Sequence, residues 1–408
     1  MKYAIILIDG MADEKIEKLN YKTPFEVAKT PNIDKLAKEA TFGTFLTLPD
    51  EFPTSSDVAN MSVLGWDLKR SYTGRGAVES YGAGILMTPD MVAFRMNLIT
   101  VKDGLIEDYS AGHISEEEAR VLIDYLKENL DTEEMFMGQG VSYRHLLYFK
   151  GEKYSPNIAY EKPDSSHGIE WETILPKALD EKAKLTEEKL IKLVYKSKEL
   201  LENHPINIKR VKEGKNPANI VWPWSGGGKP DMQTFYEMYN KKGAIVSAVD
   251  VILGLGRLGE MDIDKPEGAT GFIDTNYENK AIAAVELLKK NDFVYLHVEA
   301  VDECGHMGDL EKKIDAIESV DKRLVGKFLE VYYKEIGEEI RIMILPDHPV
   351  PIRLRQHTRD KVPFMVWGKN VKVDENIKEY NEETCKNGKY TNLKGRELMD
   401  LLFANEEI

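Results

Sequence analysis

Five short apolar runs, each of the length of one buried strand, constrain this chain more than any other feature. Amphipathic segments of helical length lie between most of them, including 279–290 and 311–336. Apolar strands that alternate with helices are typical of a parallel sheet with helices on both faces. We therefore predict an α/β fold with an open, mostly parallel sheet. The runs are YAIILI (3–8), AIVSAV (244–249), FVYLHV (293–298), RIMILP (341–346) and PFMVW (363–367).

The middle of the chain has a different pattern. Short β-like runs, such as MVAFRMNLITV and SYRHLLYF, accompany two amphipathic helices predicted at 115–130 and 186–204. This mixture is typical of an α+β domain. We predict that residues 90–228 form such a domain, smaller than and inserted into the α/β domain of residues 1–89 and 229–408.

Charge and composition limit the partners of the protein. The formal net charge of −15 repels nucleic acid and anionic membranes on average. No apolar run approaches the roughly 20 residues of a membrane-spanning helix. The only cysteines, Cys304 and Cys385, make neither a disulfide framework nor a Cys-based zinc site. We expect a cytoplasmic protein that binds no nucleic acid and no membrane, and the sequence leaves its oligomeric state open.

Acidic and imidazole side chains follow three of the apolar runs. IILIDG ends in Asp9, FVYLHVEAVD ends in Asp302, and RIMILPDH ends in Asp347 and His348. The carboxyl ends of parallel strands meet at one edge of a sheet, where ligands bind in such folds. One Asp after a strand is usually a turn or a helix cap. Three such strands together favour a shared site.

Two further histidines extend this group. His306 lies four residues after Asp302, so both side chains share one face if the segment is helical. His357 lies in a predicted loop just before the last strand. Mixed carboxylate and imidazole ligands suit Mn²⁺ or Zn²⁺, and two such ions could clamp a phosphoryl group. The candidates form two sets, which are Asp302, His306 and His357, and Asp9, Asp347 and His348.

A phosphoryl-transfer site can also use a nucleophile. The segment DEFPTSSDVANMSVLGWD places Ser55 and Ser56 just before a predicted helix. In one interpretation a serine only caps that helix. In the other, the helix dipole and free N–H groups favour a bound phosphate, and a nearby cation makes the serine hydroxyl a nucleophile. The residues alone leave both interpretations open.

Eight segments occur in an order that resembles the archaeal-type cofactor-independent phosphoglycerate mutases of the alkaline phosphatase superfamily. They are IDGMAD, TPNIDKLAKEA, PTSSDVANMSVLGWD, YTGRGAVESYGAG, GATGFIDTNYENKAIAA, VDECGHMGD, ILPDHPVPI and HTRDKVPFMVWG. The resemblance covers nearly the whole chain. It implies an alkaline-phosphatase-like fold and the interconversion of 3- and 2-phosphoglycerate, which is a small phosphorylated substrate.

The same resemblance implies the chemistry of the site. Members of that family bind two divalent metal ions, often Mn²⁺, with Zn²⁺ or Mg²⁺ as alternatives, and a serine is transiently phosphorylated. The serine immediately before the acidic residue, here Ser56, would be the nucleophile. One metal ion would take Asp302, His306 and His357, and the other would take Asp9, Ser56, Asp347 and His348.

The expected substrate ligands depart from the family pattern. Arg75 in YTGRG and Arg95 in VAFRMN are similar to family motifs and are candidate anion ligands. The mutases often carry a second Arg after an Ala-Gly pair, where this chain has His113 in SAGHI. They often carry an Arg before a Gly-rich loop, where VWPWSGGGKP has Trp224 and Lys229. Arg binds carboxylate through two N–H groups and Lys or His does not, so we predict a weaker carboxylate clamp.

These departures leave other hypotheses open. Asn60 also stands where many relatives have a His, and a related branch with this altered pattern is linked to homoserine kinase activity. A metal-dependent phosphatase or phosphonate hydrolase would instead transfer the phosphoryl group to water. A non-catalytic binding protein would leave the strand-end ligands unexplained. The remaining histidines have no matching partners in the sequence and are interpreted as structural or surface residues; they are His145, His167, His204 and His297.

Overall fold

The computed structural model describes residues 1–408, which form two compact units. Unit 1 comprises Met1–Tyr72 and Met232–Ile408, and unit 2 is the intervening segment Thr73–Asp231. The chain therefore leaves unit 1 once and returns to it once.

The first boundary lies earlier in the chain than residue 90, where the sequence suggested it. Helix α5 (Arg75–Gly82) packs directly on strand β3 (Met91–Lys102) of unit 2. A Cβ atom on Gly76 would lie 2.5 Å from the carbonyl oxygen of Ala93, so only glycine allows this approach. Thr73 Oγ1 also donates to the carbonyl oxygen of Gly228, at 2.7 Å. Helix α5 therefore belongs to the smaller unit.

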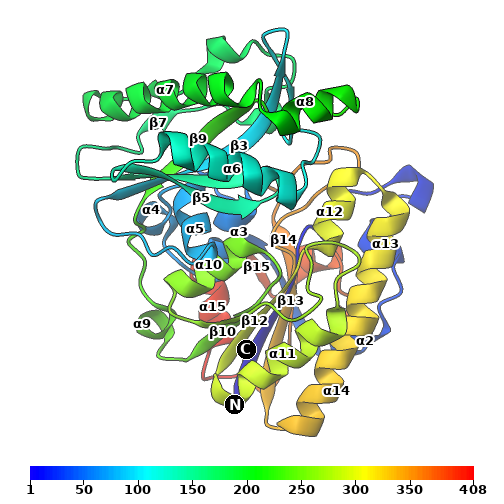
Figure 1. The fold of residues 1–408 in the computed structure, drawn as a ribbon. Coiled ribbons are helices and arrows are strands. Elements are labelled where there is room, and N and C mark those ends of the chain that lie inside the picture. Colours follow the sequence, from blue (N-terminus) through cyan, green and yellow to red (C-terminus); the bar gives the residue numbers. More distant parts are fainter. The chain divides into compact units, whose positions relative to one another are not determined.

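Unit 1 is built on an eight-stranded sheet in which only one strand runs against the others (Figure 1). The middle strand β1 pairs in parallel with β12 on one side and β13 on the other. The predicted mostly parallel α/β fold is confirmed. In spatial order the strands are β11 (Asp262–Asp264), β10 (Gly243–Val246), β12 (Phe293–Val298), β1 (Lys2–Ile8), β13 (Ile340–Leu345), β14 (Val362–Gly368), β2 (Ala40–Leu46) and β15 (Tyr390–Lys394).

The run PFMVW was expected to be a parallel strand, and this expectation is wrong. It forms β14, which pairs antiparallel with both β13 and β2. Residues 346–361 between β13 and β14 contain no crossover helix, which a parallel connection would need. An antiparallel β14 begins at the edge where β13 ends, and this places His357 near the carboxyl end of β13.

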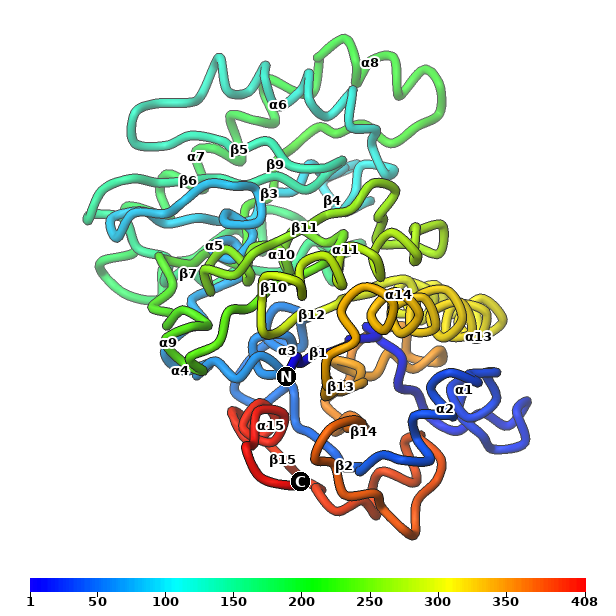
Figure 2. The backbone as a smooth tube through the Cα atoms, turned by 90° about the horizontal axis from the view of Figure 1, so that it is seen from below, coloured from blue at the N-terminus to red at the C-terminus, as the bar shows by residue number.

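Helices cover both faces of this sheet. Alternate strand residues point to opposite faces: Ile6 packs with the helices of one face, whereas the Tyr3 ring lies 4.9 Å from the Phe403 ring on the other. Figure 2 shows α13 and α14 on one side of the strands and α15 on the other. The first face carries α2 (Pro31–Ala37), α11 (Tyr277–Lys290), α13 (Leu310–Ser319) and α14 (Gly326–Glu335), and the second carries α3 (Ser56–Val63), α9 (Phe235–Tyr239), α10 (Asp250–Leu258) and α15 (Glu397–Leu402).

The long helix predicted at 311–336 is continuous but contains one irregular turn. A π-helical segment, Val320–Val325, joins α13 to α14. It carries Asp321, whose carboxylate accepts hydrogen bonds from the backbone N–H groups of Asn32 and Ile33 at 3.2 and 2.7 Å. Asp321 therefore caps the first turn of α2 from another part of the chain.

Unit 2 is an α+β unit built on a five-stranded antiparallel sheet. The order is β4-β3-β6-β5, and β9 also pairs antiparallel with β3, over Val92–Ile99. Its core consists of residues from these strands and from the two predicted helices, which form α6 and α7. The elements are β4 (Leu105–Asp108), β6 (Arg144–Lys150), β5 (Met135–Val141), β9 (Ile220–Gly228), α6 (Glu116–Leu130), α7 (Lys184–Leu201) and α8 (Pro205–Lys212).

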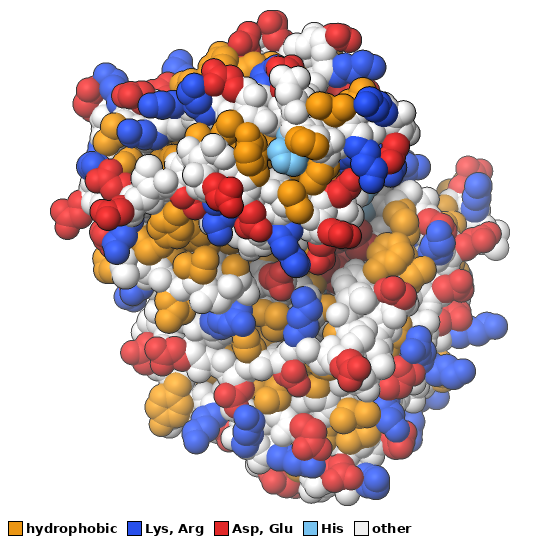
Figure 3. Space-filling model, in the orientation of Figure 1, with side chains coloured by type: hydrophobic (Ala, Val, Ile, Leu, Met, Phe, Trp, Pro, Cys, Tyr) orange, Lys and Arg blue, Asp and Glu red, His pale blue; other side chains and the backbone are white.

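The remaining α-helices and strands are short. They are α1 (Pro24–Val27), α4 (Leu68–Ser71) and α12 (Ala300–Met307), and the two-residue strands β7 (Ile158–Ala159) and β8 (Lys177–Ala178). No helix of the structure combines the length and the apolar character that crossing a membrane requires. On the face shown in Figure 3, Lys and Arg side chains are interspersed with Asp and Glu.

His145 in β6 predicts how the stability of unit 2 depends on pH. Its ring is buried, Nδ1 accepts a hydrogen bond from the N–H of Gly140 at 3.1 Å, and burial lowers its pKa from 6.5 to about 4. The unfolded state therefore binds this proton more tightly, so stability is complete above pH 6.5 and is lost as the pH falls toward 4. Between pH 7 and pH 5 this loss is about 2 kcal/mol.

The variant His145→Gln keeps an acceptor for Gly140 but cannot gain the proton. Its free energy of unfolding, measured by urea titration, should fall less than that of the wild type between pH 7 and pH 5. An equal fall in both proteins would contradict the assignment.

Candidate active site

The carboxyl ends of β12, β1 and β13 meet, as the order of the strands requires. Asp9 directly follows β1, and its N–H donates to the carbonyl oxygen of Val298 at 2.9 Å. The next residue, Gly10, has a φ of +66° and lies so close to α12 that a Cβ atom would be 2.5 Å from Asp302 Cα. The Gly10 N–H donates to Asp347 Oδ1 at 3.3 Å. Three segments that are far apart in sequence are thus in direct contact.

The first predicted ligand set comes together. Asp302 and His306 lie one turn apart on α12, and His306 Nε2 is 3.3 Å from Asp302 Oδ2. His357 approaches from the loop before β14, with Nε2 3.5 Å from Asp302 Oδ1. One potential ligand atom from each of the three residues lies within 4.8 Å of the others. This geometry can hold a metal ion.

The second predicted set, Asp9, Asp347 and His348, is fully buried and equally compact. His348 Nε2 lies 3.6 Å from Asp9 Oδ1 and 3.3 Å from Asp347 Oδ2. The His348 ring also stacks on His357, with 3.7 Å between centroids, and its Nδ1 is 3.9 Å from Asp302 Oδ1. The two sets are therefore neighbours.

The charges in this cluster require a counter-ion. Burial, and then the nearby Asp347 and Asp302, raise the pKa of Asp9 well above its usual value. Burial also raises the pKa of Asp347 to about 6. The Oδ1 atoms of Asp9 and Asp302 are buried and accept no hydrogen bond. Buried carboxylate oxygens without donors are costly unless a cation coordinates them, so the residues fit divalent metal ions.

Asp302 stays ionised because its neighbours are imidazoles. Burial opposes its charge, but the imidazoles of His306 and His357, whose Nε2 atoms lie 3.3 and 3.5 Å from its carboxylate oxygens, outweigh this effect and hold its pKa well below the usual value. In the same way, burial would lower the pKa of His306, but the hydrogen bond to Asp302 raises it to about 9. Asp302 and His306 thus stabilise each other's charged forms.

Ser56 is the first residue of α3 and faces the second set. Its Oγ lies 3.2 Å from His348 Nε2. Ser55 is the N-cap residue, but its side chain makes no capping hydrogen bond. Asn60, one turn further along α3, donates to Asp347 Oδ2 at 2.9 Å and to the carbonyl oxygen of Ser56 at 2.8 Å. Asn60 therefore fixes the serine relative to the carboxylates.

Sequence reasoning missed the role of His297, which was thought to have no partner. Its Nε2 lies 3.2 Å from Asp9 Oδ2, and its Nδ1 lies 3.2 Å from Ser247 Oγ. Burial lowers its pKa to about 3, so the ring is neutral. Tyr295, two residues earlier, donates its hydroxyl proton to Asn60 Oδ1. A signal was present, because a Tyr and a His at alternate positions of an apolar strand point to the same face.

In unit 2 the structure brings Arg75 and Arg95 together on one carboxylate. Arg75 Nε lies 2.7 Å from Glu79 Oε1, and Arg95 Nε lies 3.1 Å from Glu79 Oε2. Burial favours the neutral acid, but Arg95 and Arg75 hold the pKa of Glu79 below its usual value. The Arg95 guanidinium also lies 4.4 Å from the centroid of Trp224, which buries it. Sequence reasoning did not identify Glu79.

The other two predicted substrate ligands are placed differently. His113 is exposed and meets the ring of Tyr143 edge-on at 6.1 Å. The exposed Arg144 lies over the same ring, at 5.2 Å, and adds to the positive potential at Glu79. Lys229 is exposed and has no hydrogen bond or ion pair in the structure. Of the four predicted substrate ligands, the structure therefore brings only Arg75 and Arg95 together. It adds the positive charge of Arg144, which acts on the same carboxylate, Glu79.

Comparisons with known proteins identify the family of the chain. The family model described as the Metalloenzyme superfamily matches residues 1–405. A 2,3-bisphosphoglycerate-independent phosphoglycerate mutase of Methanosarcina mazei is 44% identical over 405 residues, which cover 99% of this chain and 100% of the relative.

Solved structures show the same relationship. A Pyrococcus horikoshii protein has a TM-score of 0.81 and 30% identity, covering 100% of this chain and 98% of its own. The cofactor-independent phosphoglycerate mutase of Thermoplasma acidophilum has a TM-score of 0.66 and 28% identity, covering 98% and 99% of the two chains. The chain belongs to the family of 2,3-bisphosphoglycerate-independent phosphoglycerate mutases in the Metalloenzyme superfamily.

Proposed function

We propose that the protein interconverts 3-phosphoglycerate and 2-phosphoglycerate through a phosphoserine at Ser56, beside two divalent metal ions. The observation that carries the proposal is the position of the Ser56 hydroxyl. It lies at the first turn of α3 and 3.2 Å from His348, within a cluster of buried carboxylates and imidazoles. The 44% identity to a relative that is named for this reaction supports it.

The cluster suits two ions, with Mn²⁺ as the first choice and Zn²⁺ or Mg²⁺ as alternatives. When bound, such ions stabilise negative charge on phosphoryl oxygens and lower the pKa of a nearby hydroxyl. The proposed ligands of one ion are Asp302, His306 and His357, and those of the other are Asp9, Ser56, Asp347 and His348.

The chain itself supplies the nucleophile. Ser56 gives up its hydroxyl proton as Oγ attacks the phosphorus atom of 3-phosphoglycerate, the Oγ–P bond forms, and the bond from phosphorus to the C3 oxygen breaks as that oxygen takes a proton. Glycerate stays bound, and its C2 hydroxyl then gives up its proton and attacks the phosphoserine. The Oγ–P bond breaks and Ser56 regains a proton, so no external phosphate donor is consumed. The free N–H groups and dipole of α3 favour the phosphoryl group at Ser56.

We propose Arg75 and Arg95 as ligands of the substrate carboxylate. Glu79 holds the guanidinium groups of Arg75 and Arg95 in fixed positions, and a preorganised guanidinium binds a carboxylate through paired N–H groups. His113 and Lys229 are proposed as additional substrate ligands, although neither contacts this arginine pair.

Metal removal provides the first test. Protein treated with a chelator and then reloaded should bind two Mn²⁺ ions per chain and should melt at a higher temperature, since a ligand at 100 times its Kd adds about 2.7 kcal/mol. The variant Asp302→Asn should bind fewer ions, measured by elemental analysis after dialysis. Asp262→Asn, at the edge of the sheet and paired with Lys290, is the control and should bind two. Wild-type protein without stoichiometric metal would refute the proposal.

Replacement of the two adjacent serines provides the second test. Ser56→Ala should keep its metal content but lose at least about 1000-fold in kcat. Ser55→Ala is a matched control, because the Ser55 hydroxyl is buried but makes no hydrogen bond, and it should retain most of the activity. The assay is interconversion of the two phosphoglycerates with Mn²⁺ and without ATP.

Parallel assays distinguish the competing activities. Consumption of ATP only in the presence of homoserine would instead indicate a kinase. Release of free phosphate as fast as isomerisation would indicate a phosphatase. Either result, or an active Ser56→Ala variant, would contradict the proposed mutase mechanism.

A further inference from the structure

We propose that Lys313 is a positioning residue that sets the relative placement of the chain segments carrying both metal ligand sets. The inference rests on the metal-binding part of the proposed function. Lys313 lies outside both ligand sets, on α13, which follows directly after the helix that carries Asp302 and His306. Its side chain is completely buried.

The ammonium group of Lys313 joins the loops after β1 and β13. Nζ donates to Asp13 Oδ2 at 2.8 Å, to the carbonyl oxygen of Val350 at 2.8 Å and to that of Ala12 at 3.4 Å. Three acceptors match the three N–H groups of an ammonium. Ala12 and Asp13 follow Asp9 by three and four residues. One cation thus connects α13 with the segments on which the ligands of the second set lie.

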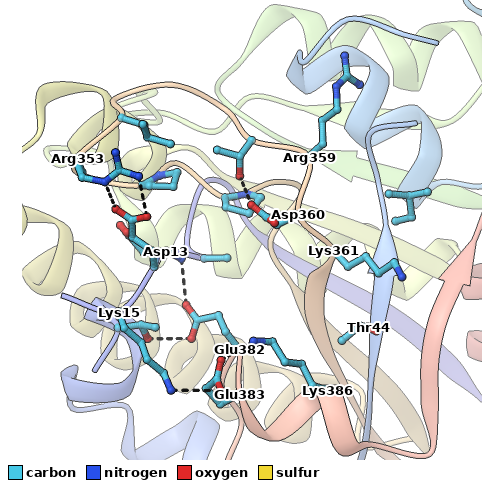
Figure 4. A pocket seen from close by; sticks show the side chains of 18 of the residues that line it. Asp13, Lys15, Thr44, Arg353, Arg359, Asp360, Lys361, Glu382, Glu383 and Lys386 are labelled. Carbon is cyan, nitrogen blue, oxygen red and sulfur yellow. Dashed lines mark hydrogen bonds and ion pairs between the residues drawn. The ribbon is translucent and has the colours of Figure 1, made fainter. Parts of the chain in front are cut away.

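Asp13 strengthens the same junction. Its Oδ2 also accepts a hydrogen bond from the N–H of Ile352 at 3.2 Å, and the Val350 N–H donates to the carbonyl oxygen of Ala12 at 3.2 Å. Figure 4 shows Asp13 beside Glu382, whose Oε1 accepts a hydrogen bond from the Asp13 N–H at 3.1 Å. The loop after β1 is therefore held by hydrogen bonds that involve main-chain groups and by one buried charge pair, Lys313 with Asp13.

Stability alone does not require this ion pair. Transfer of two charges from water into a protein interior costs about as much as their attraction returns, and a well-packed apolar pair is often equally stable. The ammonium group instead fixes the relative positions of three chain segments, because its three hydrogen bonds connect α13 with the loops after β1 and β13. Groups that orient metal ligands in this way typically change metal affinity by 10–100-fold when they are removed.

The decisive variant neutralises both partners, Lys313→Met with Asp13→Asn. The amide of Asn keeps an acceptor for the Ile352 N–H, and neither member of the charge pair is left buried without the other. We expect the melting temperature of the metal-free double variant to approach that of the wild type. We expect its Kd for Mn²⁺, measured by titration calorimetry, to rise by about 10–100-fold. The single variant Lys313→Met should lose both stability and Mn²⁺ affinity, because Asp13 is left buried without its partner.

Unit 2 offers a matched control. Arg210 is also buried, pairs with Glu118, and donates to the carbonyl oxygens of Ala111 and Asn216 at 2.7 and 2.8 Å. Arg210→Met with Glu118→Gln should lower the melting temperature without changing the Kd for Mn²⁺.

The outcomes separate the two proposals. A Kd for Mn²⁺ in the Lys313 and Asp13 double variant within twofold of the wild-type value would overturn the positioning role, whatever its melting temperature. A similar loss of Mn²⁺ affinity in the Arg210 control would also overturn it, since any buried ion pair would then have this effect. Wild-type protein that binds no Mn²⁺ would refute the proposed function and this inference together. In active preparations of the Lys313 and Asp13 double variant, kcat should fall while KM for phosphoglycerate stays unchanged.

Discussion

Like charges buried at the edge of one sheet are the constraint around which unit 1 is built. Asp9, Asp302 and Asp347 lie where three adjacent strands end, and their mutual repulsion is strong because little water is present to screen it. Hydrogen bonds from the Gly10 N–H and the Asn60 amide offset part of this cost. The donor set that remains, carboxylates beside imidazoles, is one that a divalent cation would stabilise.

The parallel part of the fold could be predicted from the sequence because its strands are apolar on both faces. Such strands stand out as continuous runs, and four of the five runs have the expected direction. β2 was missed because ATFGTFL mixes threonine and glycine with its apolar residues, and it is recognisable as a strand only beside β14. The direction of β14 depends on the conformation of the preceding loop, which no periodicity records. The position along the chain at which unit 2 begins likewise depends on the close packing of Gly76 against β3, which composition does not show.

For the candidate site, the sequence could group those residues that the chain order itself brings to the ends of strands. Asp9, Asp302 and Asp347 follow strands directly, so the topology of the sheet was enough to group them. Glu79, which holds two arginines, and Lys313, which joins two loops, are charged residues on helices, and such residues are usually solvated. Only tertiary packing shows that they are buried. His297 is an intermediate case, because a histidine inside an apolar strand was visible but its partner was not.

The insertion of unit 2 between residues 72 and 232 has a consequence for the synthesis of the protein. The ribosome produces β1 and β2 first, but the parallel neighbours of β1 are made only at residues 293–298 and 340–345. Unit 2 is one continuous segment, and its antiparallel strands pair over shorter separations in sequence than β1 and its neighbours do. It can therefore fold before β12 and β13, the parallel neighbours of β1, have been synthesised. Until the last third of the chain emerges, β1 lacks both of its parallel neighbours, so we expect its apolar residues to be open to chaperone binding during this interval.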